Sequence, residues 1–176
     1  MARFDAFLPL LLNFEGGFVD DPADPGGATN KGITLETFSG CAQNLLGFAP
    51  SLDNLKSLTD LQAATIYNAL YWETIRGDEI ALQDLANILC DFYVNAGVHA
   101  TKLLQNLLNE LGATLEIDGV IGPAVMQVLA AMDQQDLYRR YKAGRIAYYR
   151  DLVQKQPSLE KFLTGWLNRV NSFPDV

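Results

Sequence analysis

The sequence predicts a mainly α protein with one minor β element. Apolar residues recur at helical spacing along most of the chain, for example in residues 4–15 and 103–111. Helix start signals precede several of these stripes, such as Thr59 with Gln62, which has the pattern of a capping box. β-branched residues around a turn signal are concentrated in one short stretch, 113–122, which is the best candidate for strand structure.

The first half of the chain alternates helices with two loops. The helix over 4–15 contains Pro9, which either kinks it or lies in its first turn. Residues 16–33 hold five glycines and two prolines without helical period, so they predict a long shaped loop. Thr34 is placed to cap a helix over 35–46. Residues 47–57 predict a second loop, and the capping box opens a helix that runs to about Ile75.

The second half predicts mostly helices. An apolar stripe over 85–96 is interrupted by Gly97, and the next helix stops at Gly112. Pro123 opens a helix at its favoured first position, and Asp133 begins a long helix to about Gln154. In that long helix we expect the tyrosines to face inward and the arginines to form a solvated face. Ser158 is predicted to cap the last helix, and no linker composition divides the chain, so we expect one compact body.

Composition and charge limit the partners. The 176 residues carry 13 Lys plus Arg against 21 Asp plus Glu, a net charge of -8. Nucleic acids and anionic membranes need a basic surface, so the charge argues against both but allows a neutral sugar polymer. No apolar run reaches membrane-spanning length. Cys41 and Cys90 lie among apolar neighbours and predict buried free thiols, and His99 is the sole histidine, so we expect no metal and no cofactor.

Glu15 is the most informative single residue. At the helical period it lies about 20° from Phe4, on the apolar side of the first helix. Desolvation raises the pKa of a Glu side chain and keeps it protonated, as a general acid requires. The alternative is a surface Glu15, or one that bonds the loop backbone.

The loop that follows Glu15 carries groups suited to a ligand. Gly26 and Gly27 allow close approach to the backbone, and Asp24 supplies a carboxylate. Thr29, Asn30 and Thr34 add short polar side chains. The loop's aspartates lack the spacing of a calcium loop. A long irregular segment in a small domain is typical of a functional loop.

The block EGGFVDDPADPGGATNKGIT, residues 15–34, closely resembles the signature of glycoside hydrolase family 108, lysozyme-like N-acetylmuramidases that include proteins called secretion activators. Further stretches that resemble family landmarks are Tyr71-Trp72 with Asp78, residues 91–97 and residues 165–170. The stretch DGVIGP, 118–123, is similar to a turn of a peptidoglycan-binding module fused in that family. The resemblance covers nearly the whole chain and implies a lysozyme-like fold.

The resemblance also implies roles for individual residues. Glu15 matches the proton donor, and Asp24 with Thr29 is similar to the Glu, Asp and Thr set of phage-type lysozymes. The spacing leaves open whether Thr29 or Thr34 supplies the working hydroxyl. The implied substrate-binding residues are Gly26, Gly27, Asn30, Tyr71, Trp72, Asp91 and Asn95. For Tyr71 and Trp72 the alternative is core packing, and for Asp91 with Asn95 it is a helix-surface hydrogen bond.

Together these features predict a peptidoglycan hydrolase that cuts the β-1,4 bond between MurNAc and GlcNAc. Residues 1–97 would form the catalytic region, and residues 98–176 a peptidoglycan-binding-like lobe with C-terminal helices. A retaining, an inverting and a lytic transglycosylase outcome stay open, as does a non-catalytic wall-binding or secretion-assisting protein. The partner would be the glycan strands of peptidoglycan. The N-terminus lacks the pattern of a signal peptide, so we expect synthesis in the cytoplasm and action on the cell wall after release, for example through a holin pore.

Overall fold

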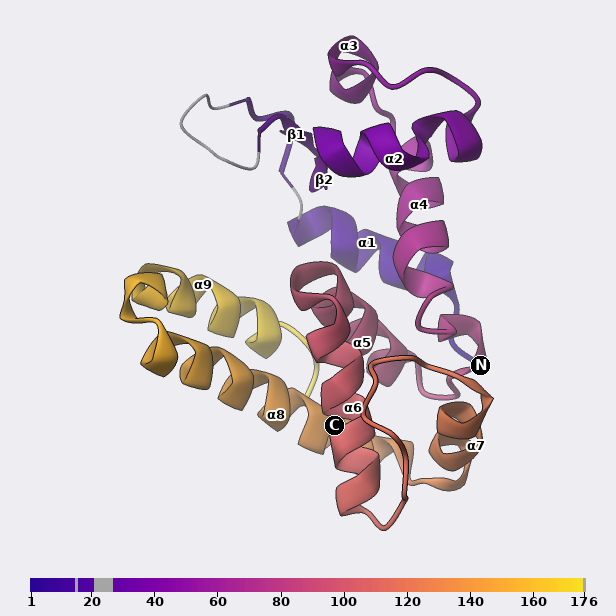
Figure 1. Ribbon diagram of the computed structural model, residues 1–176, viewed down its shortest axis with the longest axis vertical. Helices are drawn as coiled ribbons and strands as arrows, with labels where there is room; N and C mark the ends of the chain where they lie inside the picture. Colours follow the sequence, from indigo (N-terminus) through magenta and orange to yellow (C-terminus); the bar gives the residue numbers. More distant parts are fainter. Residues whose placement is uncertain (15, 21–26, 176) are drawn as a thin grey trace. The chain divides into compact units, whose positions relative to one another are not determined.

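A computed structural model describes residues 1–14, 16–20 and 27–175 and shows two compact units (Figure 1). The N-terminal unit is Phe4–Leu70, and the C-terminal unit is Met1–Arg3 with Tyr71–Val176. The sequence predicts a single body because no loop marks the boundary. The division falls inside a continuous helical run, where α4 (Asp60–Tyr67) passes into the π-helical segment η1 (Asn68–Trp72).

The N-terminal unit contains the predicted helices and the β structure. Helix α1 (Phe4–Phe14) continues through Pro9 and buries Phe7 and Leu11 completely. The described part of the loop contains a two-stranded antiparallel sheet, β1 (Thr29–Asn30) and β2 (Ile33–Thr34). The β element therefore lies in the segment for which no regular structure is predicted.

The capping predictions for this unit are confirmed. The Thr34 side chain accepts a hydrogen bond from the Thr37 amide at the start of α2 (Leu35–Leu46). The capping box of Thr59 and Gln62 opens α4, with both reciprocal bonds present. The predicted loop over 47–57 is wrong in part, because Ser51 caps a short helix, α3 (Leu52–Lys56). Five helical residues are too few to show an apolar period.

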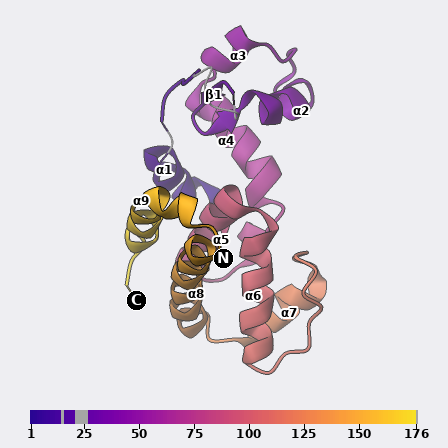
Figure 2. The same ribbon diagram turned by 60° about the vertical axis from the view of Figure 1, so that its left-hand side comes forward.

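The C-terminal unit is a set of packed helices. After the short segment η2 (Gly77–Glu79) it contains α5 (Gln83–Ala96) and α6 (Val98–Glu110), and later α7 (Pro123–Ala131) and α8 (Gln134–Lys155). Helices α5, α6 and α8 pack on one another around buried leucines and tyrosines. Helix α9 (Glu160–Asn171) follows the short turn η3 (Pro157–Leu159) and lies beside α8 in both views (Figure 1, Figure 2).

Two predictions in this unit are wrong. Residues 113–122 form no strand, because side chains of α6 satisfy their backbone groups instead. Asn109 bonds both the amide and the carbonyl of Leu115, and Gln105 accepts from the Gly119 amide at 2.8 Å. Ser158 does not cap the last helix, since it lies inside η3 and α9 begins without a side-chain cap.

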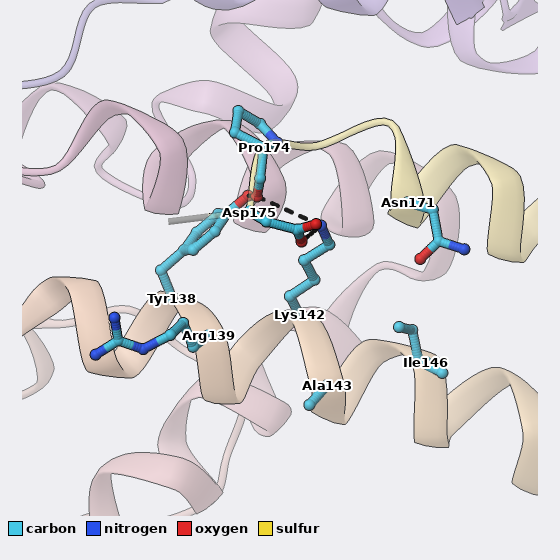
Figure 3. Close-up of a pocket in the computed structure, with 8 residues that line it drawn as sticks. All are labelled: Tyr138, Arg139, Lys142, Ala143, Ile146, Asn171, Pro174 and Asp175. Carbon is cyan, nitrogen blue, oxygen red and sulfur yellow. Dashed lines mark hydrogen bonds and ion pairs between the residues drawn. The ribbon is translucent and has the colours of Figure 1, made fainter.

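The C-terminal segment is fastened to α8 (Figure 3). The Tyr138 hydroxyl donates to the Pro174 carbonyl at 2.7 Å, and Lys142 donates to the Phe173 carbonyl at 2.7 Å and pairs with Asp175 at 2.6 Å. A cavity of about 350 Å³ lies beside this contact. Burial raises the pKa of Tyr138 to about 12.

Candidate functional site

The hairpin of the N-terminal unit is a tight one. Thr29 pairs with Thr34 and Asn30 with Ile33, so Lys31 and Gly32 form a two-residue turn. Both have positive φ, 51° and 75°, which is the pattern of a type I′ turn. Gly32 adopts this conformation at little cost, but Lys31 has a Cβ and needs compensating contacts.

Those contacts come from the neighbouring helices. The Tyr67 hydroxyl of α4 donates to the Lys31 carbonyl at 2.9 Å, and the Lys31 ammonium pairs with Asp60 at 2.5 Å. The Asn30 side chain is buried and donates to the carbonyls of Leu55 and Lys56 at the end of α3. The hairpin is therefore fixed to α3 and α4. Asn30 supports the backbone, which differs from its predicted role in substrate binding.

The hairpin also closes the base of the glycine-rich loop. Val19 and Thr29 exchange two backbone hydrogen bonds, both 2.8 Å long, in an antiparallel bridge. The Lys56 ammonium at the end of α3 lies 5.2 Å from the centre of the Phe18 ring, and this contact holds residue 18 against α3. Val19 and Thr29 are thus held on a fixed scaffold.

The two candidate threonines have different surroundings. The Thr34 hydroxyl accepts from the Thr37 amide at 3.2 Å and donates to the Thr37 hydroxyl at 3.1 Å, so it is engaged in the cap of α2. The Thr29 residue is half-buried, and among the described residues its hydroxyl has one long bond, 3.4 Å, to the Gly27 carbonyl. A bond of that length is weak, which leaves the Thr29 hydroxyl available for another partner.

Glu15, Asp24 and Gly26 lie outside the described residues. Gly27 is exposed and has a φ of 68°, so its backbone adopts the left-handed conformation that glycine favours. Among the predicted site residues of this unit, the structure brings Gly27 and Thr29 together at the base of the loop.

The aromatic pair Tyr71 and Trp72 belongs to the C-terminal unit. The Trp72 side chain is 1% exposed and its indole nitrogen donates to Asp78 at 2.8 Å. A Cβ at Gly77 would lie 2.3 Å from the indole, so the ring fills the space that this glycine leaves. No ring face of Trp72 is open to a sugar. Tyr71 is half-buried and meets the Tyr93 ring edge-on.

Asp91 is the centre of a buried charge cluster. Its carboxylate pairs with Arg145 of α8 at 2.7 Å and with Arg169 of α9 at 2.8 Å, and both Asp91 and Arg145 are fully buried. The Arg145 guanidinium packs near the rings of Phe92 and Tyr149. Its Nε and Nη1 atoms have no hydrogen-bond partner among the described residues. The cluster ties α5, α8 and α9 together.

This arrangement corrects two expectations. Asp91 does not line a groove, because its oxygens face two arginines inside the unit. Arg145 does not belong to a solvated face, although Tyr138, Tyr141 and Tyr149 do point inward as predicted. The sequence does contain a sign of this burial. Arg145 is four residues after Tyr141 and four before Tyr149, so it lies on the same helix face as these two inward-facing tyrosines. Asn95 is exposed, and its amide donates to the Asp91 backbone carbonyl at 2.6 Å.

The cavity beside the C-terminal segment and the ionisable side chains of the described residues do not form a further catalytic centre. The cavity beside the C-terminal segment has its cations engaged, since Lys142 pairs with Asp175 and Arg139 with Asp136. Within the described ranges, His, Cys, Asp and Glu side chains form no group of three placed to hold a metal ion. Every helix in those ranges is too short or too polar to span a lipid bilayer. Both cysteines are buried free thiols, as predicted.

A mainly helical chain with one small antiparallel hairpin is consistent with a lysozyme-like fold. The comparisons define it further. The chain belongs to the glycosyl hydrolase 108 family, whose model matches residues 8–97. A second model, described as a predicted peptidoglycan domain, matches residues 99–171.

A solved structure supports the same assignment. The chain is similar to the protein in "Structure of Brucella abortus SagA", with a TM-score of 0.77 and 31% sequence identity. The alignment covers 97% of this chain and 90% of that one. Among curated proteins, none matches the chain. The family and the second domain make the chain a peptidoglycan-related glycoside hydrolase.

Proposed function

We propose that the protein is an N-acetylmuramidase that cleaves the β-1,4 bond between MurNAc and GlcNAc. The observation that carries the proposal is the base of the glycine-rich loop, where the Val19–Thr29 bridge holds Thr29 with a weakly bonded hydroxyl. This segment directly follows Glu15 in the sequence and lies within the region that matches the glycosyl hydrolase family.

The proposed chemistry needs an acid and a negative charge. Glu15 protonates the oxygen of the leaving sugar, and Asp24 supplies the second carboxylate that stabilises the developing oxocarbenium ion or activates water. We assign the assisting hydroxyl to Thr29 rather than Thr34, because the Thr34 hydroxyl is engaged in capping α2. Gly27 leaves the loop backbone open to the sugar.

The test of the acid is Glu15→Gln, assayed on purified cell-wall sacculi. New reducing ends from the unaltered chain indicate hydrolysis, and 1,6-anhydro ends indicate transglycosylation. We expect Glu15→Gln to abolish release, while Glu36→Gln, an exposed glutamate of α2 in the same unit, keeps full activity. Retained turnover in Glu15→Gln removes Glu15 from the mechanism.

The test of the hydroxyl compares two threonines. Thr29→Val should lower kcat by about 10²-fold, since misplaced reacting groups cost about that much, with an unchanged thermal midpoint. Thr34→Asn keeps a capping oxygen but has no hydroxyl, and it should keep activity. A normal rate for Thr29→Val with a slow Thr34→Asn reverses the assignment.

The second candidate function is binding to the cell wall without cleavage, in a structural or secretion-assisting role. It is favoured by the match of residues 99–171 to a peptidoglycan domain, which by itself requires no chemistry. Sedimentation of the unaltered protein with sacculi, without release of either kind of sugar end, supports this candidate and contradicts the muramidase.

A further inference from the structure

A continuous row of aromatic rings crosses three helices of the C-terminal unit. Trp166 of α9 stacks on Tyr149 of α8, with ring centroids 5.0 Å apart and planes 20° apart. Phe162 extends the row on α9, 5.8 Å from Trp166. On the other side Tyr148 meets Tyr149 at 5.5 Å, and His99 at the start of α6 lies 5.5 Å from Tyr148.

The row is buried at Tyr149 and exposed at both ends, at His99 on α6 and at Phe162 on α9. Tyr149 is 3% exposed and supports the Trp166 ring from behind. Trp166 is half-buried, and Phe162 is 46% exposed. Neighbouring rings at such distances attract one another, which holds Phe162 and Trp166 in a defined orientation. The two rings, four residues apart on one helix face, form a supported aromatic surface.

Gly165 lies between these two residues in the sequence and has no structural explanation. A Cβ at this position would meet nothing within 4 Å, and its φ is not positive. Gly144 of α8 differs, since a Cβ there would lie 2.9 Å from Leu103. Glycine inside a helix is destabilising relative to alanine. Gly165 thus leaves the helix backbone uncovered beside Phe162. It lowers the stability of the helix, and packing within the chain does not explain why a glycine is present there.

We propose that Phe162, Gly165 and Trp166 form a platform that binds the glycan strand of peptidoglycan, with the rings stacked on the C–H faces of the sugars. This rests on the proposed function in taking peptidoglycan as the ligand. The matched peptidoglycan domain, residues 99–171, contains every ring of the row. Gly165 lets the edge of a sugar approach the helix backbone.

The net charge of the chain favours a glycan over a single-stranded nucleic acid, the other ligand that stacks on aromatic rings. Aromatic platforms also bind single-stranded nucleic acids, but such sites need a positively charged groove along the backbone phosphates. The chain has a net charge of -8, and the Lys161 ammonium lies 4.9 Å from the centre of the Phe162 ring. A largely neutral glycan, with stem-peptide carboxylates near its edge, fits this balance.

The experiment measures binding in the Glu15→Gln background, so that sacculi are not consumed. We expect Phe162→Ala to raise the Kd for purified sacculi about ten-fold, equal to about 1.4 kcal/mol, because the exposed part of the ring no longer covers a sugar. Phe162→Tyr should bind normally. Val98→Ala removes a comparably exposed apolar side chain of the same unit, 49% exposed, and should have no effect.

Gly165→Ala separates ligand binding from stability. If the platform binds glycan, this variant has a higher thermal midpoint and weaker binding, since the methyl group stabilises the helix and obstructs the sugar. Glycan strands freed of stem peptides should compete with sacculi and change the fluorescence of Trp166, whereas Trp72 is buried.

If Phe162→Ala binds sacculi as tightly as Val98→Ala, the platform is overturned. Competition by free stem peptides but not by stripped glycan also overturns it. Reducing-end release by the unaltered chain is measured in parallel. If Phe162→Ala binds normally while the unaltered chain releases reducing ends, the platform is wrong and the muramidase proposal still holds. If the unaltered chain binds glycan at the platform without releasing ends, the platform holds and the muramidase proposal is wrong.

Discussion

Asp91→Asn removes the carboxylate that pairs with Arg145 and Arg169 inside the C-terminal unit. Asp91 and Arg145 are fully buried, and the Arg169 side chain is 17% exposed. The substitution preserves shape and leaves two guanidinium groups facing a neutral amide. Arg145 already has two nitrogens without a hydrogen-bond partner in the described structure, so it has no second anion there to compensate.

Breaking a buried ion pair by removing one partner costs about 3–5 kcal/mol. For a chain of this size each kcal/mol shifts the melting temperature by about 2–4 °C, so the expected loss is roughly 6–20 °C. Asp175→Asn is the matched control, because it breaks the Lys142 pair with a side chain that is 96% exposed. Exposed pairs contribute about 0–1 kcal/mol.

Urea unfolding followed by tryptophan fluorescence measures this loss in the relevant unit, since Trp72 and Trp166 both belong to it. At a temperature well below its midpoint, Asp91→Asn should still cleave sacculi, because the carboxylate touches no substrate. An unchanged free energy of unfolding together with lost activity would refute this reasoning and restore the groove-lining role that the family resemblance implies.

Further predictions concern other buried groups. Arg145→Met should cost less than Asp91→Asn, because Arg169 still pairs with the carboxylate; unfolding free energies compare the two. Asn30→Ala leaves two carbonyls at the end of α3 without their donor and should destabilise the hairpin by about 1–3 kcal/mol, seen as faster amide exchange there. The Tyr138 pKa is raised to about 12, so the folded state holds this proton longer than the unfolded state; stability should be constant below pH about 10 and fall between about 10 and 12. Burial, and then the neighbouring Asp91 charge, raise the pKa of the Cys90 thiol, so it should react with thiol reagents only after unfolding.

Local sequence signals predicted the elements well where each signal acts within a few residues. The caps at Thr34, Thr59 and Asp133 are present, because a side-chain oxygen and an amide two or three positions later meet whenever the helix forms. The strand predicted at 113–122 is absent because this segment depends on contacts with residues outside it. Its backbone groups are satisfied by Gln105 and Asn109, residues whose proximity depends on how the segment folds back on α6.

Some features of the candidate site could likewise be predicted from the sequence, and others depended on tertiary contacts. The order of Glu15, the glycine-rich loop and Thr29 is a property of the sequence, and the family match bears out the resemblance drawn from it. The distinction between Thr29 and Thr34 needed their hydrogen bonds, and the burial of Trp72 and Asp91 needed the packing of the C-terminal unit. Spacing shows which helix face a residue shares but not what covers that face.

The sequence by itself determined the mainly helical class, most helix boundaries and the family, because helical period, caps and a twenty-residue signature are local patterns. The tertiary structure alone decided that Asp91 serves two buried arginines, that Asn30 supports the end of α3, and that rings from three helices form one row. These contacts join residues far apart in the chain. Their energies depend on distance and desolvation, which exist only after the helices have packed.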